Sequence, residues 1–540
     1  MGVTAILLSL AVVACTAAPP SVPPTGGSTP KTRIPPAPAS GSTPNQTTCG
    51  ATSGGTSSSD FSDSIGSASS DLVGAGFNTA GIVRMGQGLT GTIPPGRGSA
   101  GPPNDTPRGN GPPGNGTPGG GPPAPPRALT ASEAVDRAME AANHSRKDQI
   151  ASGADRPLPV AITSIDESGR PQIRQVSGAD YNTTAAAAVS TVEQSLLAGE
   201  SVINVEADQI VTSDDLSEPR AAWFNPLALL DPATRTSIVN SPSTEATLTE
   251  EAATDPGRKN QWALDQFRFE DASQAVSGEE NLLVSVVDSG IDVDHPDLAG
   301  VVVASHNFTQ EALTTPGAHG THVAGIIAAV AQNGMGGRGA TPDVRLMNAK
   351  ALDSTGSGYM SDAADAVIWS VDNGASVVNL SLAGDRSSTA MDAALAYAED
   401  SGTVVVAAAG NDGVAQKRDG AAAGQLYSWP AADPRTIAVA ALDESGSVSG
   451  FSTCAPYVDV AAPGGLIYST YPANRYVYMS GTSMATPYVS SLAVLTMATE
   501  PTATASQIRS RITSQATDIG APGRDGSSGW GKVNLASLTH

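Results

Sequence analysis

The chain has 540 residues, and its 29 Lys and Arg against 52 Asp and Glu give a formal net charge of −23. This acidic balance argues against nucleic acid and anionic lipid as electrostatic partners and fits a soluble extracellular protein. With 3 cysteines the chain cannot be held together by a dense disulfide framework.

The N-terminus begins with an apolar run at residues 5–14. It is too short to span a bilayer as a helix, and it is typical of the apolar part of an export signal, which we place at residues 1–14. The residues before Cys15 resemble the lipid-attachment motif of bacterial lipoproteins. Residues 1–4 carry no Lys or Arg, however. Two destinations therefore stay open, a cell surface reached through lipidated Cys15 and secretion as a soluble protein.

Residues 15–127 are dominated by Pro, Gly, Ser and Thr. They hold too few large apolar side chains to offset the conformational entropy lost on folding, so we expect a disordered stalk. Cys49 falls in this stalk. A bridge from Cys49 to Cys454 would tie the stalk down, and we instead expect Cys454 to be a small buried apolar residue.

A separate small α+β domain is predicted at residues 128–212. Its pattern is helix, strand, turn, strand, alanine-rich helix and strand, at residues 132–146, 158–165, 166–171, 172–176, 184–197 and 202–206. The acidic segment that follows, residues 213–257, reads as a linker.

Residues 258–540 alternate apolar strands with helices, which predicts an α/β fold with a parallel sheet and helices on both faces. The expected strands are 282–288, 344–351, 377–382, 403–409 and 436–441, and the expected helices are 319–331, 360–373, 390–401, 483–498 and 504–515.

Four polar residues stand where these elements begin or end. Asp288 ends a buried strand, His319 opens an apolar helix, Asn411 follows the strand 403–409, and Ser483 opens the helix 483–498. Open α/β sheets place catalysis at the carboxyl ends of their strands. A Ser, a His and an Asp at such positions are the parts of a nucleophilic triad.

The motifs around Asp288, His319 and Ser483, in that order, resemble those of subtilisin-type serine proteases, and the resemblance covers residues 258–540. It implies that His319 takes the proton of Ser483 and that Asp288 orients the imidazole. It also implies that the Asn411 amide and the Ser483 backbone N–H bind the oxyanion.

The same resemblance implies two strand-like edges that bind an extended polypeptide substrate. One is formed by Ser381, Leu382, Ala383 and Gly384, and the other by Gly356, Ser357 and Gly358. Main-chain pairing of this kind would give broad specificity. Asp412 would lie at the rim of the main specificity pocket, where it would favour basic side chains.

Calcium is the one cofactor that the resemblance suggests, as a structural ion that the chemistry does not need. Asp297, Asn333 and Gln261 match positions that hold calcium in many relatives, and a hydrogen-bonded turn without metal is the alternative. His319 and His322, three residues apart, could face a metal, but Gly and Thr between them replace the glutamate of a zinc-protease helix. His322 is therefore expected to be structural.

Residues 128–212 resemble the inhibitory propeptide of secreted subtilisin relatives, which implies a self-processing zymogen with its own propeptide as an intramolecular inhibitor. We expect a monomer that cuts polypeptides. A catalytically silent member that acts as a cell-surface binding protein is the alternative, and a processing protease with a single target is a third. The sequence does not separate broad from narrow specificity.

Overall fold

The computed structural model describes residues 127–152, 158–213, 255–413 and 427–539. The predicted stalk, the export signal and Cys15 lie outside these residues. In the described residues no helix is long and apolar enough to cross a membrane.

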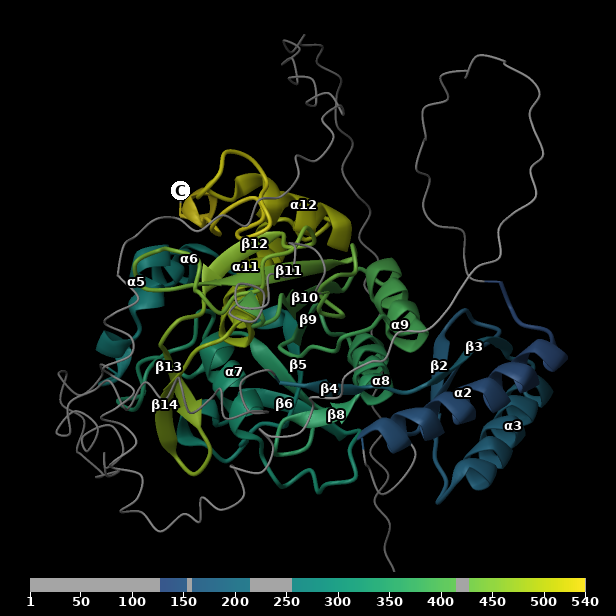
Figure 1. The fold of residues 1–540 in the computed structure, drawn as a ribbon. Helices are drawn as coiled ribbons and strands as arrows, with labels where there is room; N and C mark the ends of the chain where they lie inside the picture. The colour runs from purple at the N-terminus through teal and green to yellow at the C-terminus, as the bar shows by residue number, and fades with distance from the viewer. Residues whose placement is uncertain (1–126, 153–157, 214–254, 414–426, 540) are drawn as a thin grey trace, which may run out of the picture. The chain divides into compact units, whose positions relative to one another are not determined.

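A seven-stranded sheet forms the centre of the C-terminal part, and all its neighbouring strands are parallel (Figure 1). Its order is β12-β11-β10-β9-β5-β7-β6. In chain order the strands are β5 (Leu283–Asp288), β6 (Val302–Asn307), β7 (Arg345–Lys350), β9 (Val377–Leu380), β10 (Val404–Ala408), β11 (Thr436–Leu442) and β12 (Val460–Pro463).

Helices cover both faces of this sheet because its strands send alternate apolar side chains to opposite sides. Val377 packs in the cluster that includes α7 (Ala318–Ala328), α11 (Thr482–Thr499) and α12 (Ala505–Gln515). Val378 packs in the cluster of α8 (Met360–Asp372) and α9 (Thr389–Asp400). The α/β fold predicted from the sequence is confirmed.

Shorter elements complete this part of the molecule. Two helices, α5 (Trp262–Phe267) and α6 (Phe269–Ala275), precede β5. The hairpin of β13 (Ile467–Tyr471) and β14 (Arg475–Met479) packs against α7.

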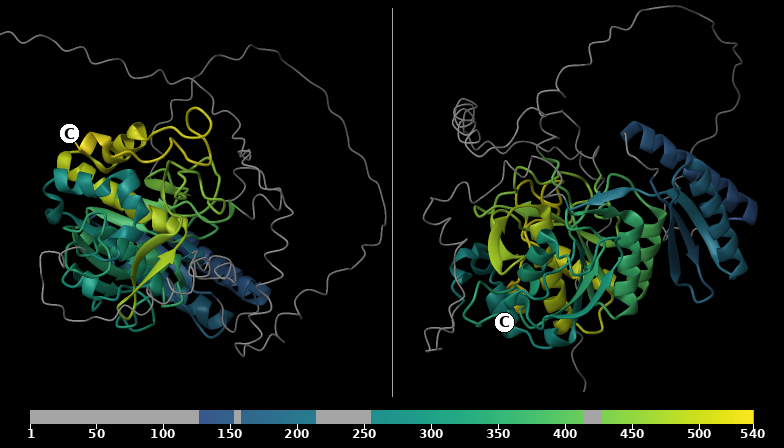
Figure 2. Two further views of the ribbon diagram at one scale, coloured as in Figure 1. Left: turned by 90° about the vertical axis from the view of Figure 1, so that its left-hand side faces the viewer. Right: turned by 90° about the horizontal axis from the view of Figure 1, so that it is seen from below.

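The N-terminal α+β unit is a three-stranded antiparallel sheet in the order β2-β1-β3, with two helices packed on it. Its elements are α2 (Ala131–Ser152), β1 (Val160–Ile165), β2 (Pro171–Val176), α3 (Tyr181–Leu197) and β3 (Ser201–Ala207). The strands also contact α8 and α9, beside which Figure 2 shows this unit. Ile173 of β2 is buried in the same cluster as α8 and α9.

After β3 the chain enters a short strand, β4 (Ile210–Thr212), which pairs antiparallel with β8 (Ser357–Tyr359). An isolated bridge joins Thr212 to Ala383 on the other side. The segment 210–213 therefore lies between the two edges that the sequence predicts for substrate.

Candidate active site

Asp288 and His319 form a buried pair at the carboxyl edge of the sheet. Asp288 is the last residue of β5, which lies between β7 and β9, and His319 is the second residue of α7. Both are 0% exposed. His319 Nδ1 lies 2.8 Å from Asp288 Oδ1 and 2.9 Å from Oδ2. This contact fixes the imidazole ring and stabilises positive charge on it.

The carboxylate is itself held by the residue that follows it. The Ser289 N–H donates to Asp288 Oδ1 at 2.6 Å, and the Ser289 hydroxyl donates to the same oxygen at 3.0 Å. The Ser289 hydroxyl oxygen also accepts from Gly320 N in α7. The strand end that carries Asp288 is thus bonded directly to the first turn of the helix that carries His319.

Ser483 is the second residue of α11, a helix that packs against α7. Its backbone N–H lies in the first helical turn, where N–H groups have no partner within the helix. The Ser483 hydroxyl is 3.4 Å from the Ser381 carbonyl oxygen, and the Ser381 hydroxyl donates to the Ser483 carbonyl at 2.8 Å. The predicted nucleophile, Ser483, thus lies directly beside the predicted substrate edge at Ser381.

Asn411 follows β10, and the residue before it, Gly410, has a φ of 97°, which favours glycine. The Asn411 amide oxygen accepts from Thr482 N at 2.9 Å and from the Thr482 hydroxyl at 3.1 Å. These bonds hold the Asn411 oxygen against Thr482 and so fix the orientation of the side-chain amide. Asn411 is thereby linked to the residue that precedes Ser483, a link that the sequence did not indicate.

Both predicted substrate edges are paired with the same segment of chain. Thr212 and Ala383 exchange two backbone hydrogen bonds, of 3.0 and 2.9 Å, and Ser213 N donates to the Gly356 carbonyl at 2.8 Å. Val211 stands opposite Gly358 in the β4–β8 ladder and is 0% exposed. An extended segment is therefore hydrogen-bonded on both sides, to β8 and Gly356 on one and to Ala383 on the other.

Two carboxylates near the end of β3 bind the first turns of α8 and α9. Glu206 accepts from Thr389 N at 2.8 Å and from the Ser388 hydroxyl at 2.9 Å. Asp208 accepts from the backbone and hydroxyl of Ser361. Carboxylates at helix N-termini satisfy unpaired N–H groups and favour the helix dipole. The sequence analysis did not single out either residue.

The three side chains predicted to hold calcium are bonded to protein groups. Asn333 Nδ2 donates to Asp297 Oδ1 at 2.7 Å, and Asn333 Oδ1 accepts from Met335 N at 2.9 Å. The Gln261 amide bonds both backbone groups of Arg338, at 3.0 and 2.7 Å. Calcium needs about six or more oxygen ligands, and here an amide nitrogen faces the carboxylate. As they lie, these side chains do not fit a calcium ion.

Burial raises the pKa of Asp297 to about 6, although hydrogen bonds from Asn333, Tyr476 and Gly337 act in the opposite direction. Within the described ranges no group of three or more His, Cys, Asp or Glu side chains is placed to hold a metal ion. The local arrangement corresponds to the alternative of a hydrogen-bonded turn.

His322 is buried, and its Nε2 lies 3.2 Å from the Val477 carbonyl oxygen. Burial lowers the pKa of His322 to about 3. This environment agrees with a structural role. Asp412 is partly exposed, and its N–H donates to the Thr453 hydroxyl at 3.0 Å. This contact does not test the prediction that Asp412 favours basic side chains in the substrate.

Cys454 is disulfide-bonded, so the expectation of a simple buried apolar residue is wrong. The chain has two other cysteines, Cys15 and Cys49, both outside the described residues. The sequence analysis argued against a Cys49–Cys454 bridge because it would tie the stalk down. A cross-link acts by restricting the unfolded chain, which local composition does not show.

A parallel α/β sheet that carries an Asp–His pair, a helix-start serine and an oriented amide at its carboxyl edge defines a serine hydrolase. Residues 279–531 match the model of the subtilase family. The chain is 41% identical over 240 residues to subtilisin DY of Bacillus licheniformis, 44% of this chain and 85% of that protein. It is 41% identical over 242 residues to thermitase of Thermoactinomyces vulgaris, 44% of this chain and 82% of that protein.

A thermophilic serine proteinase of Bacillus sp. (strain AK1) is 44% identical over 227 residues, which span 42% of this chain and 53% of that protein. The chain belongs to the subtilase family of serine endopeptidases.

Proposed function

We propose that the protein is an exported endopeptidase made as a self-processing zymogen, in which the N-terminal α+β unit inhibits the catalytic domain until the linker 213–257 is cut. The observation that carries the proposal is the segment 210–213, which pairs with β8 and Ala383 like an extended substrate. The carboxylates Glu206 and Asp208, which bind α9 and α8, support a docked inhibitor.

Peptide hydrolysis would follow from the geometry. His319 takes the Ser483 hydroxyl proton as the oxygen attacks the scissile carbonyl, and Asp288 stabilises the imidazolium. Asn411 Nδ2 and the Ser483 N–H donate to the resulting oxyanion. His319 then protonates the leaving amine, and water hydrolyses the acyl-enzyme by the same steps in reverse. No metal takes part in these steps.

The test is expression of the full chain beside the Ser483→Ala variant, with a fluorophosphonate probe. We expect the wild type alone to shorten to a labelled fragment of roughly the length 258–540. If neither protein shortens or reacts, the silent cell-surface binding protein becomes the better proposal.

We also propose that Cys15 carries a lipid that anchors the protein at the cell surface. Secretion as a soluble protein is the alternative. The proposal of a lipid rests on the residues before Cys15 alone. Metabolic labelling with a fatty acid analogue, in wild type and Cys15→Ser, separates the two destinations.

A further inference from the structure

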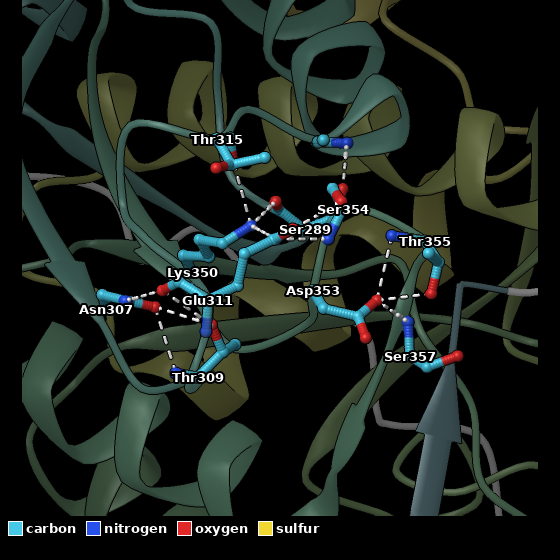
Figure 3. A network of polar contacts seen from close by, with 12 residues as sticks. Ser289, Asn307, Thr309, Glu311, Thr315, Lys350, Asp353, Ser354, Thr355 and Ser357 are labelled. Atoms are coloured by element: carbon cyan, nitrogen blue, oxygen red, sulfur yellow. Dashed lines mark hydrogen bonds and ion pairs between the residues drawn. The ribbon is translucent and has the colours of Figure 1, made fainter.

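A fully buried lysine ends β7 beside the triad aspartate. The parallel register sets Lys350 opposite Asp288, and the Lys350 side chain is 0% exposed. Its ammonium contacts the Ser289 carbonyl at 2.6 Å, the Thr315 carbonyl at 3.1 Å and the Glu311 carboxylate at 3.0 Å (Figure 3). An ammonium has three N–H donors, so these contacts use all of them.

Two of these partners, Ser289 and Thr315, belong to the segments that hold Asp288 and His319 in place. Ser289 is the residue whose N–H and hydroxyl bind the Asp288 carboxylate. Thr315 lies in the loop that leads into α7, three residues before that helix begins at Ala318. Lys350 therefore joins the strand end that carries Asp288 to the approach of the helix that carries His319.

The third partner, Glu311, reaches the substrate edge. Its carboxylate accepts from Ser354 N and from the Ser354 hydroxyl, both at 2.7 Å. Burial raises the pKa of Glu311, but the hydrogen bonds from Ser354 and Lys350 outweigh it and leave the pKa below its usual value. The carboxylate is thus ionised at neutral pH, and it fixes the start of the loop 353–357.

Hydrogen bonds within the loop 353–357 hold its shape, and the loop continues directly into β8. Asp353 Oδ1 accepts from Thr355 N at 2.9 Å and from Ser357 N at 3.1 Å, and Asp353 N donates to the Ser357 carbonyl at 2.8 Å. A displacement of Ser354 would therefore be carried to β8 and to Gly356.

We propose that Lys350 and Glu311 form a positioning pair that couples the substrate edge at loop 353–357 and β8 to the Asp288–His319 half of the triad. This proposal rests on the proposed function. The Lys350 ammonium is buried whereas the Glu311 side chain is 27% exposed, so loss of Glu311 would leave an uncompensated buried charge, and the ammonium holds its three partners in one arrangement. A peptide that pairs with β8 would then use its binding energy to align the triad, and would raise turnover rather than only affinity.

The test compares a short anilide substrate, which cannot reach β8, with a longer peptide that pairs along it. Rates are normalised to the concentration of Ser483 labelled by the fluorophosphonate probe. The protein is expressed as the full chain and allowed to process itself. In the wild type we expect kcat to rise with substrate length. In Lys350→Met we expect kcat on the long peptide to fall by about 100-fold and the length dependence to disappear.

A milder variant guards against misfolding, since Lys350→Met removes a buried cation together with all three of its contacts. Ser354→Ala removes only the hydroxyl bond to Glu311, and it should lower kcat on the long peptide by about 5-fold and lower kcat on the short substrate by less. The control is Arg345→Met at the opposite end of β7, where the exposed guanidinium bonds the Gly300 carbonyl. Arg345→Met should leave the kinetics on both substrates unchanged.

An equal loss on both substrates in Lys350→Met would overturn the coupling and reduce Lys350 to a support of the triad. If Lys350→Met does not fold, unchanged kinetics of Ser354→Ala overturn the proposal. A wild type that hydrolyses neither substrate contradicts the proposed function instead, and that result is obtained before any variant is made.

Discussion

Thr212 and Ala383 face each other as an antiparallel pair that exchanges both backbone hydrogen bonds. In such a pair each step forward on one strand is a step back on the other. Ser213 therefore stands at the level of Leu382, and a substrate residue one position further along would stand at the level of Ser381. The Ser381 carbonyl oxygen is 3.4 Å from the Ser483 hydroxyl.

The register predicts where self-processing begins. We expect the first cut to follow Asp214, because a substrate chain that continued the register of 210–213 by one residue would present its carbonyl to Ser483. Asp214 itself is outside the described residues. The measurement is the N-terminal sequence of the first core fragment, whose expected start is Asp215. A first cut more than a few residues away would contradict the register argument.

Loss of the oriented amide should slow chemistry without unfolding the protein. Asn411→Ala removes the Nδ2 donor, and kcat should fall by about 10²–10³-fold, a range already established for an oxyanion donor in this family. KM should change little, since the donor acts on the transition state. Steady-state kinetics with active-site titration measure both. Thr453→Ala, which removes a bond to the neighbouring Asp412 N–H, is the control.

Docking of the α+β unit should weaken as pH rises. Burial raises the pKa of Asp208, and burial with the nearby charges of Asp208 and Asp365 raises the pKa of Asp362 to about 8. Exposed aspartates titrate near pH 4. Docking therefore takes up protons. The contribution of these carboxyls to the free energy of docking is complete below about pH 4, and it is lost as the pH rises toward about 8.

The other charged groups at this contact include Glu206, whose pKa burial also raises, and Asp365, whose pKa burial raises to about 6 although Arg170 and Arg174 act in the opposite direction. Arg170 also pairs with Asp372 at 2.6 Å. The measurement is hydrogen-exchange protection of β4 in the Ser483→Ala chain, corrected for the intrinsic rate. Protection should fall between pH 5 and pH 8, by at most about 10-fold per pH unit for each linked proton. Asp362→Asn should flatten the curve, and protection that increases with pH would contradict the assignment.

Removal of calcium should leave the fold intact. The side chains of Asp297, Asn333 and Gln261 already satisfy one another and the backbone. Chelation should therefore shift the unfolding temperature by less than about 1 °C, because a ligand stabilises only a protein that binds it. Calorimetry with and without a chelator checks this, and a drop reversed by added calcium would show that the loop rearranges to bind the ion.

Sequence periodicity predicted the five inner strands of the sheet, but it missed both edge strands, β6 and β12, although the four residues of β12 are buried. β10 is a continuous apolar run and β5 is apolar except for Ser285 and Asp288, and their predicted bounds differ from the structure by one residue at most at either end. β6 at the edge of the sheet alternates between exposed and half-buried residues and ends on Ser, His and Asn, so it gave no run to detect.

Residues that act through contacts distant in sequence could not be predicted. Asp288, His319 and Ser483 stand in recognisable local motifs, whereas Glu206 and Asp208 gain their partners from helices more than 150 positions away. Lys350 offered one clue, a charge at the end of an apolar strand. Nothing local identified Glu311 as its partner, since that pair depends on how two loops meet.

The disulfide of Cys454 changes what cutting the linker would accomplish. If its partner is one of the other two cysteines of the chain, which both precede residue 213, the bridge spans the linker 213–257. A single cut there would give two fragments on a reducing gel and one undiminished band without reductant. A severed inhibitor held in this way keeps an effective concentration on the order of millimolar, which dilution does not lower. Activation would then require destruction of the α+β unit rather than its departure, so further cleavage and not dissociation would set the time at which the enzyme becomes active.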